Sequence, residues 1–292
     1  MPFVTTDDCS LYYEAHGPAP GTAPAIVFAH GAGGNHLSWW QQVPHFRDRF
    51  TCVTFDHRGF GQSIEKPGGR GGSAFVDDLR ALLDHLGIAR AHLVAQSMGG
   101  WSCLGFTIRY RERVGRLVMC DTPGGLLTDE MAAAWSVKET SPSALPDGVH
   151  PAAGTRMHRE QPALHFLYTQ ISDLNPARSL AELGALLRAA GALTLDAVAT
   201  LDVPVLFIVG MEDIVIPPLV LERAAAHFKN ARVSNGFPPP ATRCTSSVPS
   251  FSTQSSTHFS TRMRKVSTRS GLDRARLDSV PRLLCPCRAL PR

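Results

Sequence analysis

The chain has 292 residues, of which 43% are hydrophobic and 18% are charged, and its formal net charge is +4 at pH 7. These values predict one large globular domain or two small ones. They argue against a membrane protein, because no apolar run approaches the roughly 18–20 residues that a bilayer requires, and against a disulfide framework or zinc site, because the seven cysteines lack the necessary spacing.

The N-terminus does not show the charged segment and apolar stretch that are typical of a signal peptide. We therefore expect a cytoplasmic protein that contacts no membrane.

Short apolar runs alternate with amphipathic stretches up to about residue 232. Five of these runs predict buried strands, at 25–30, 52–56, 91–96, 116–121 and 203–210. Helical spacing of apolar residues predicts helices at 73–87, after Ser97 and at 218–228. Strands that alternate with helices predict an α/β fold with a doubly wound, mostly parallel sheet and a site at the carboxyl ends of its strands.

A long segment without a strand-like run separates the strands at 116–121 and 203–210. Two stretches within it, TDEMAAAWSVKE and PARSLAELGALLRAAG, have helical patterns. We expect residues 122–200 to form a helical cap over the site, because a structureless loop of this length is uncommon. The core would then comprise residues 1–121 and 201–233.

The sequence AQSMGG places Ser97 between a predicted strand and a predicted helix. It fits the nucleophile-elbow pattern G-x-S-x-G, with Ala95 in the first glycine position and Gly99 in the second. Small residues at these positions allow the strand and the helix to approach at a strained turn, and the first N–H groups of the helix favour an oxyanion. We expect Ser97 to be a nucleophile; the alternative is an ordinary helix N-cap.

Three more segments follow predicted strands, and they read HGAGGNH from His30, DHRGFGQS from Asp56 and VGMED up to Asp213. Together with the Ser97 motif, in this order and spacing, they resemble the α/β-hydrolase family over roughly residues 10–232. The resemblance implies the α/β-hydrolase fold and a reaction that needs no metal and no organic cofactor. It also implies that Asp56 and Arg58 belong to the scaffold.

The resemblance further assigns roles to four residues. Ser97 attacks the substrate, Asp213 is the acid of the catalytic triad, and the backbone N–H groups of Ala32 and Met98 form the oxyanion hole. Asp121 also follows a predicted strand and is an alternative acid. Asp213 could instead cap the helix at 218.

Other residues have simpler interpretations. We expect His30 to be structural and the histidines of the 122–200 segment (150, 158 and 165) to be solvated or part of the cap. Aromatic residues are expected in the core and the pocket wall (Trp39, Trp40, Phe106 and Trp135).

The chain lacks an obvious general base. In this family the base is a histidine that follows the acid, usually in a Gly-His dipeptide before a final helix. The histidines beyond Asp213 are His227, inside a predicted helix, and His258, among serines and threonines. Neither has the expected context.

The last 60 residues differ from the rest in composition. Residues 233–292 contain 10 Lys and Arg but 2 Asp and Glu, whereas residues 1–232 contain 19 and 23. Half of residues 241–270 are Ser or Thr. We expect the tail, 234–292, to be disordered, because it has no apolar period. We do not expect nucleic-acid binding, because the basic residues have no aromatic stacking platform beside them.

A shifted reading frame explains this tail. Permitted codons for residues 241–251, read one nucleotide out of register, give GHSVYFERPELF, and the residues that follow can give NAVVDAFLDA. This alternative translation contains the missing Gly-His dipeptide and a final amphipathic helix. We expect that the printed chain has lost its base through a frameshift after about residue 233, so that its activity is impaired.

The sequence thus predicts a serine hydrolase that cleaves a carboxylic ester, a thioester or a lactone of a small organic acid. Its partner is a small-molecule substrate, and the sequence does not fix its oligomeric state. Two alternatives remain open: a carbon–carbon bond hydrolase with the same triad, and a non-catalytic binder on the same fold.

Overall fold

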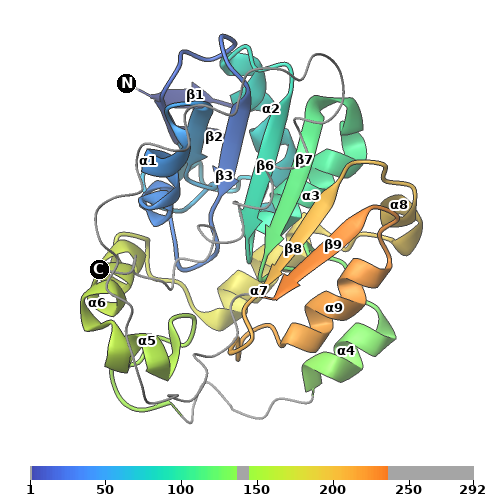
Figure 1. Ribbon diagram of the computed structural model, residues 1–292. Coiled ribbons are helices and arrows are strands. Elements are labelled where there is room, and N and C mark those ends of the chain that lie inside the picture. The colour runs from blue at the N-terminus through green and yellow to red at the C-terminus, as the bar shows by residue number, and fades with distance from the viewer. Residues whose placement is uncertain (1, 137–144, 236–292) are drawn as a thin grey trace, which may run out of the picture.

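The computed structural model describes residues 2–136 and 145–235, which build one sheet with helices on both faces (Figure 1). The sheet has nine strands in the order β1-β2-β4-β3-β6-β7-β8-β9, with β5 paired to β2. The strands are β1 (Phe3–Thr5), β2 (Cys9–His16), β3 (Ala25–Ala29), β4 (Thr51–Phe55), β5 (Ile64–Glu65), β6 (Ala91–Gln96), β7 (Val114–Cys120), β8 (Val205–Val209) and β9 (Ala231–Asn235). From β4 to β9 all pairs are parallel, whereas β1, β2 and β5 are antiparallel additions.

The helices connect the strands as a doubly wound sheet requires. The α-helices are α1 (Gln42–Phe46), α2 (Phe75–His85), α3 (Gly99–Arg109), α4 (Asp129–Ser136), α5 (Gly154–Glu160), α6 (Pro162–Asp173), α7 (Leu180–Ala190), α8 (Leu195–Ala199) and α9 (Pro218–Ala226). Three short 3₁₀ helices accompany them: η1 (His36–Trp39), η2 (Gly71–Ala74) and η3 (Arg111–Arg113). Among the described residues, no helix is long and apolar enough to cross a membrane.

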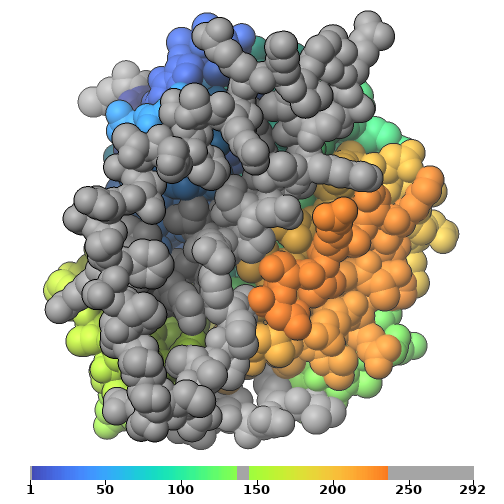
Figure 2. All heavy atoms as spheres, in the orientation of Figure 1, coloured from blue at the N-terminus to red at the C-terminus, as the bar shows by residue number. Residues whose placement is uncertain are grey.

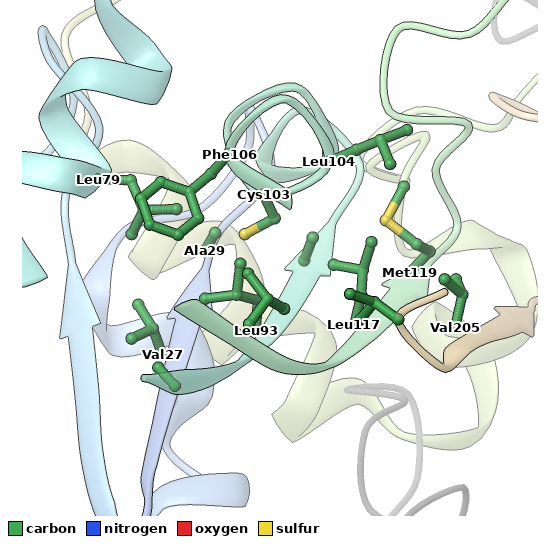
Figure 3. Packing of buried hydrophobic residues seen from close by; sticks show 14 of the residues in the cluster. Val27, Ala29, Leu79, Leu93, Cys103, Leu104, Phe106, Leu117, Met119 and Val205 are labelled. Carbon is green, nitrogen blue, oxygen red and sulfur yellow. The ribbon is translucent and has the colours of Figure 1, made fainter. Parts of the chain in front are cut away.

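One face of the sheet carries the larger core. Val27, Leu93 and Leu117 point from neighbouring strands toward the helices, where Leu79 of α2 and Phe106 of α3 meet them (Figure 3). All five side chains are fully buried. Burying such a side chain contributes about 1.5–3 kcal/mol, so this face holds the strands in the register that the site requires.

The opposite face has a smaller core. Phe28, Val94 and Ile208 lie on it, and the described residues that cover them come from η1 and α1, with Trp39 and Phe46 as the largest side chains. Strand β9 ends the sheet at Asn235, and β9 and α9 lie at the surface (Figure 2). The predicted disordered tail and the frameshift both fall outside the described residues, apart from the last residues of β9.

The sequence predictions of the main elements are confirmed. All five predicted strands exist, and the helices at 73–87, after Ser97 and at 218–228 correspond to α2, α3 and α9. The antiparallel strands β1, β2 and β5 were not predicted. Strand β2 alternates buried and half-buried residues only over its first four positions and is half-buried at Tyr12, Tyr13 and Glu14, and β1 and β5 are too short to show a period.

The helices of the 122–200 segment occupy three places, and α8 lies apart from the others, near the start of β8 (Figure 1). Helix α4 packs against α9, where Met131 and Ala134 join the main core and Glu130 pairs with Arg223 at 2.8 Å. Helices α5, α6 and α7 lie beyond the carboxyl ends of the central strands. Residues 137–144, between α4 and α5, lie outside the described chain.

Candidate active site

Ser97 occupies a sharp turn between β6 and α3. Its φ angle is +47°, in the left-handed region that non-glycine residues rarely adopt. Its N–H donates to the Cys120 carbonyl at 3.0 Å, and its carbonyl accepts from the Gly100 N–H at 2.9 Å. Helix α3 begins at Gly99 with Met98 as its N-cap, so Ser97 is not an ordinary helix cap. A strained serine held in this way at the end of a strand is a functional-site feature.

Small residues make the turn possible. A Cβ atom on Gly99 would lie 2.3 Å from the Ala29 carbonyl oxygen, and one on Gly31 would lie 3.0 Å from the Ser97 Cβ. Ala95 is fully buried in β6. These distances support the need for small residues in the A-x-S-x-G pattern. They also show that the loop after β3 lies directly against Ser97.

Ala32 and Met98 belong to the loop after β3 and to the turn before α3, respectively. Both belong to one apolar cluster with Phe60 and Trp101. Met98 is buried, and it caps the first turn of α3, where the N–H groups and the helix dipole favour negative charge. The assignment of these two residues to the oxyanion hole stays a prediction.

His30 and His57 support the loop that carries Ala32. His30 Nδ1 donates to the Gly31 carbonyl at 2.7 Å, and its Nε2 accepts from the His57 N–H at 2.9 Å. His57 Nε2 lies 3.0 Å from the Ser102 hydroxyl in α3. Burial lowers the pKa of His30 to about 4 and that of His57 well below its ordinary value. Both rings are therefore neutral at pH 7 and act as structural hydrogen-bonding groups.

Asp56 and Arg58 form hydrogen bonds and ion pairs with other residues of the chain. The buried Asp56 carboxylate accepts from the His36 N–H at 2.6 Å and from the Gln62 N–H at 2.8 Å. Arg58 is buried and pairs with Asp78 at 2.6 Å, and further with Asp8 and Glu65. These contacts fix the loop after β4 and fit the expected scaffold role.

Asp213 and Asp121 follow neighbouring strands and line the same pocket as Ser97. Asp213 Oδ1 accepts from the Val215 N–H at 2.7 Å and the Ile216 N–H at 2.9 Å. Helix α9 is capped at Pro217 without a side-chain bond, so Asp213 organises its own loop and not that helix. Asp121 has a φ of +47°, and its Oδ1 accepts from the Gly210 N–H at 2.6 Å. The geometry therefore keeps both carboxylates as candidates.

The pocket is mainly apolar, with a few polar groups. Its wall includes Trp39 and Trp40 from η1 and the residue after it, as expected. Helix α6 contributes Leu164, Tyr168 and Ile171, which share one helix face. Such a concave apolar site with a few convergent polar groups is typical of a small-molecule pocket.

The sequence analysis missed the contribution of α6. The Tyr168 hydroxyl lies against Gly33, where an added Cβ would come within 2.8 Å of it. Asn35 is fully buried and donates to the Ile171 carbonyl at 2.9 Å, which ties α6 to the loop after β3. No motif marks these residues; the only signal is the i, i+4, i+7 spacing of 164, 168 and 171.

No histidine lines this pocket in the part of the chain that the structure describes. His227 follows α9, and His150 contacts Tyr168 at a ring distance of 4.9 Å. His258 lies outside the described residues. Within the described ranges, no group of His, Cys, Asp and Glu could hold a metal ion. The described residues thus provide a candidate nucleophile and two candidate acids, but no candidate general base in the pocket.

Comparisons with known proteins agree with this geometry. A putative carbamate hydrolase, RutD, from Agrobacterium fabrum is 33% identical over 110 residues, which are 37% of this chain and 42% of that protein. The 3-oxoadipate enol-lactonase 2 of Acinetobacter baylyi is 31% identical over 135 residues, 46% of this chain and 49% of its own. The chain thus matches less than half the length of these two relatives.

A solved structure and a family profile extend the match. A thermophilic esterase from Thermogutta terrifontis superposes with a TM-score of 0.63 and 26% identity, covering 80% of this chain and 88% of that one. The profile described as alpha/beta hydrolase fold matches residues 24–235. The chain therefore belongs to the α/β-hydrolase fold family.

Proposed function

We propose that the chain is built as a serine hydrolase that cleaves a carboxylic ester, a thioester or a lactone of a small organic acid. The observation that carries this proposal is Ser97 itself, held at a φ of +47° against Gly31 and facing a pocket that Asp121 and Asp213 also line. The named relatives, a carbamate hydrolase, an enol-lactonase and an esterase, support acyl transfer to water.

The reaction would follow the two steps of an acyl-enzyme mechanism. The Ser97 hydroxyl loses its proton to the general base and attacks the substrate carbonyl carbon. The N–H groups of Ala32 and Met98 stabilise the oxyanion, and the alcohol or thiol leaves with the proton from the base. Water, activated by the same base, then attacks the acyl-Ser97 ester and releases the acid.

We assign Asp213 as the acid that orients the base. It lies in a turn whose N–H groups hold one carboxylate oxygen, and a preorganised carboxylate of this kind can fix a histidine ring. Asp121 has a second task, because its short bond to the Gly210 N–H joins the ends of β7 and β8. We therefore give Asp121 a structural role beside the site.

We further propose that the base is the histidine of the shifted reading frame. The printed chain, which places Ala241 and Thr242 where that frame reads Gly-His, would retain the nucleophile and lose most of its activity. We call the chain translated in the shifted frame after about residue 233 the restored chain. Loss of one triad member lowers kcat by roughly 10⁴–10⁶-fold.

The test is a substrate panel given to the restored chain and to its Ser97→Ala variant. We expect the restored chain to hydrolyse short acyl 4-nitrophenyl esters and the Ser97→Ala variant to lose that activity. Mass spectrometry of a slow substrate should find the acyl group on the peptide that contains Ser97. Turnover that survives Ser97→Ala, or an acyl group elsewhere, would overturn the proposal.

The same panel distinguishes the two other functions. A carbon–carbon bond hydrolase would cleave dienoic acids and leave the esters intact. A non-catalytic binder has one specific observation in its favour, which is that no histidine lines the pocket among the described residues. It predicts that the restored chain is as inactive as the printed one while both bind small molecules.

A further inference from the structure

A second cavity lies beside the loop after β3, apart from the pocket at Ser97. It measures about 330 Å³, and among the residues that the structure describes its wall shares no member with the wall of the Ser97 pocket. The wall comes from Ala32, from Phe60, from the end of α6 and the connection that follows it, and from Leu183 of α7. A cavity of this size has room for a small molecule, and the polar groups on its wall decide which kind.

Arg178 is held in this wall by an aromatic ring and a hydrogen bond. Its Cζ atom lies over the ring of Phe60, 4.3 Å from the ring centroid, and its Nη2 donates to the Gly59 carbonyl at 3.4 Å. The other terminal nitrogen, Nη1, is buried and has no hydrogen-bond partner among the described residues. A buried cationic donor without an acceptor costs free energy, and an anion that accepts from it would recover that cost.

Asn175 provides a second donor in the same wall. Its Oδ1 accepts from the Gly61 N–H at 2.9 Å, which fixes the orientation of the amide. Its Nδ2 is buried and has no hydrogen-bond partner within the described part of the chain. One guanidinium donor and one amide donor match the two oxygens of a carboxylate. Ala32 and Leu183, which belong to one apolar cluster, can contact a short carbon chain attached to it.

Two carboxylates in this part of the chain bind other groups. The charge of Arg178 reaches Glu182, but the Glu182 carboxylate accepts from the N–H and from the hydroxyl of Ser179, both at 2.7 Å. Asp173 lines the cavity and accepts from the Gln170 amide at 3.4 Å. Because Asp173 is exposed to solvent, water and salt screen its repulsion of an anion in the cavity.

We propose that this cavity binds a small organic carboxylate, held by Arg178 and Asn175, at a site separate from the pocket at Ser97. The inference goes beyond the proposed function and does not depend on it, because it concerns binding alone. The two sites adjoin at the loop after β3: Ala32 lines the cavity, and the preceding residue, Gly31, lies against Ser97. A carboxylate bound here would therefore lie beside the loop of the proposed oxyanion hole.

The test measures the binding of butanoate to the full 292-residue chain by calorimetry, with butanamide as its uncharged counterpart. We expect butanoate to bind at least about tenfold more tightly, because only the carboxylate is an anion. Arg178→Gln should lower the affinity for butanoate by at least about tenfold. The matched control, Arg159→Gln, removes an exposed cation from α5 and should leave the affinity unchanged. Equal binding of the two ligands, no binding of either, or unchanged affinity in Arg178→Gln would overturn the proposal.

Two further variants make the result specific. Val215→Trp fills part of the Ser97 pocket from its exposed edge and should leave the affinity for butanoate unchanged. A loss as large as that expected for Arg178→Gln would place the carboxylate at Ser97 and overturn the separate site. If Arg178→Gln does not fold, Asn175→Asp decides, because it keeps the acceptor for the Gly61 N–H and replaces the donor with a negative charge. It should also lower the affinity at least about tenfold, and unchanged affinity would contradict the proposal.

Discussion

The two halves of the proposed catalytic site, the nucleophile side and the acid side, differ in how completely the described residues build them. Around Ser97 each neighbour is fixed: Gly31 and Gly99 leave no room for a side chain, and Met98 starts the helix. On the acid side, Asp121 and Asp213 compete for one role, and no described histidine joins them in the pocket. The nucleophile depends on a few consecutive residues, whereas the acid and base depend on segments that meet only in the folded chain.

The largest expected effect is a difference in kcat between variants of the two carboxylates, Asp213 and Asp121. In the restored chain, Asp213→Asn should lower kcat by about 10⁴-fold, because the base would lose the group that orients it. Asp121→Asn should cost less than about tenfold, because the amide oxygen of Asn can still accept from the Gly210 N–H and no triad member is lost. The measurement is ester hydrolysis under saturating substrate. The opposite order would make Asp121 the acid.

The second prediction concerns pH and the buried rings beside the nucleophile. His30 has a folded-state pKa of about 4, below its unfolded value near 6.5. Between these two values the unfolded chain binds a proton that the folded chain refuses, so stability falls as the pH drops from 6.5 to 4. The loss should reach about 3 kcal/mol at pH 4 for this residue.

Urea unfolding at several pH values tests this prediction. His57 should add to the loss in the same direction, because burial also lowers its pKa. The pKa of Asp8 is lowered mainly by its hydrogen bond to Arg58, so the stability that Asp8 contributes disappears only below about pH 4. The pH range in which the histidines lower stability is therefore separable from the pH range in which Asp8 does. Stability that is constant between pH 6.5 and 4.5 would contradict the account of neutral buried rings.

The third prediction tests the steric basis of the turn. Gly99→Ala would place a methyl group 2.3 Å from the Ala29 carbonyl oxygen and should cost about 1–3 kcal/mol of stability. Gly184→Ala is the matched control: it lies inside α7, and its added Cβ would meet only the flexible end of Arg188 at 3.1 Å. That control should be neutral or stabilising by up to about 1 kcal/mol. Equal losses in thermal unfolding would contradict the steric argument.

The smallest expected effect concerns the hydrogen bond from Asn35, in the loop after β3, to Ile171 of α6. Asn35→Ala removes the bond to the Ile171 carbonyl and the cap of η1, and should cost about 1 kcal/mol with a few-fold rise in KM. Asn35→Asp keeps the cap oxygen, loses the donor to Ile171 and adds a buried negative charge beside that carbonyl. If both variants raise KM equally, the Asn35–Ile171 hydrogen bond positions the pocket wall. If Asn35→Asp leaves KM unchanged, this hydrogen bond has no such role.

Much of the fold was predictable because its signals are local. Near-continuous apolar runs at 25–30 and 203–210 indicate strands that are covered on both faces. Ser97 lies in a turn motif that can be identified from the small residues on either side of it. Strand β2 was not predicted, because its half-buried pattern is weak and its pairing with β4 brings together residues about 40 positions apart.

The pocket wall was less predictable for the same physical reason. Tyr168 and Asn35 carry no motif, and their importance arises from one contact each across the chain, with Gly33 and with Ile171. The assignment of Asp213 over Asp121 rests on the sequence motif and stays a prediction, because parallel strands bring both of their ends to one edge of the sheet. Long-range packing, and not composition, decides these features.

The most direct test of the central claim compares the printed chain with the restored chain in hydrolysis of 4-nitrophenyl butyrate at pH 7. The account predicts that both contain the Ser97 centre and that the restored chain is faster by roughly 10⁴–10⁶-fold, because only it supplies the base. Reading the gene across codons 225–270 provides the restored sequence. Equal rates, with the printed chain fully active, would contradict the claim that its base is missing.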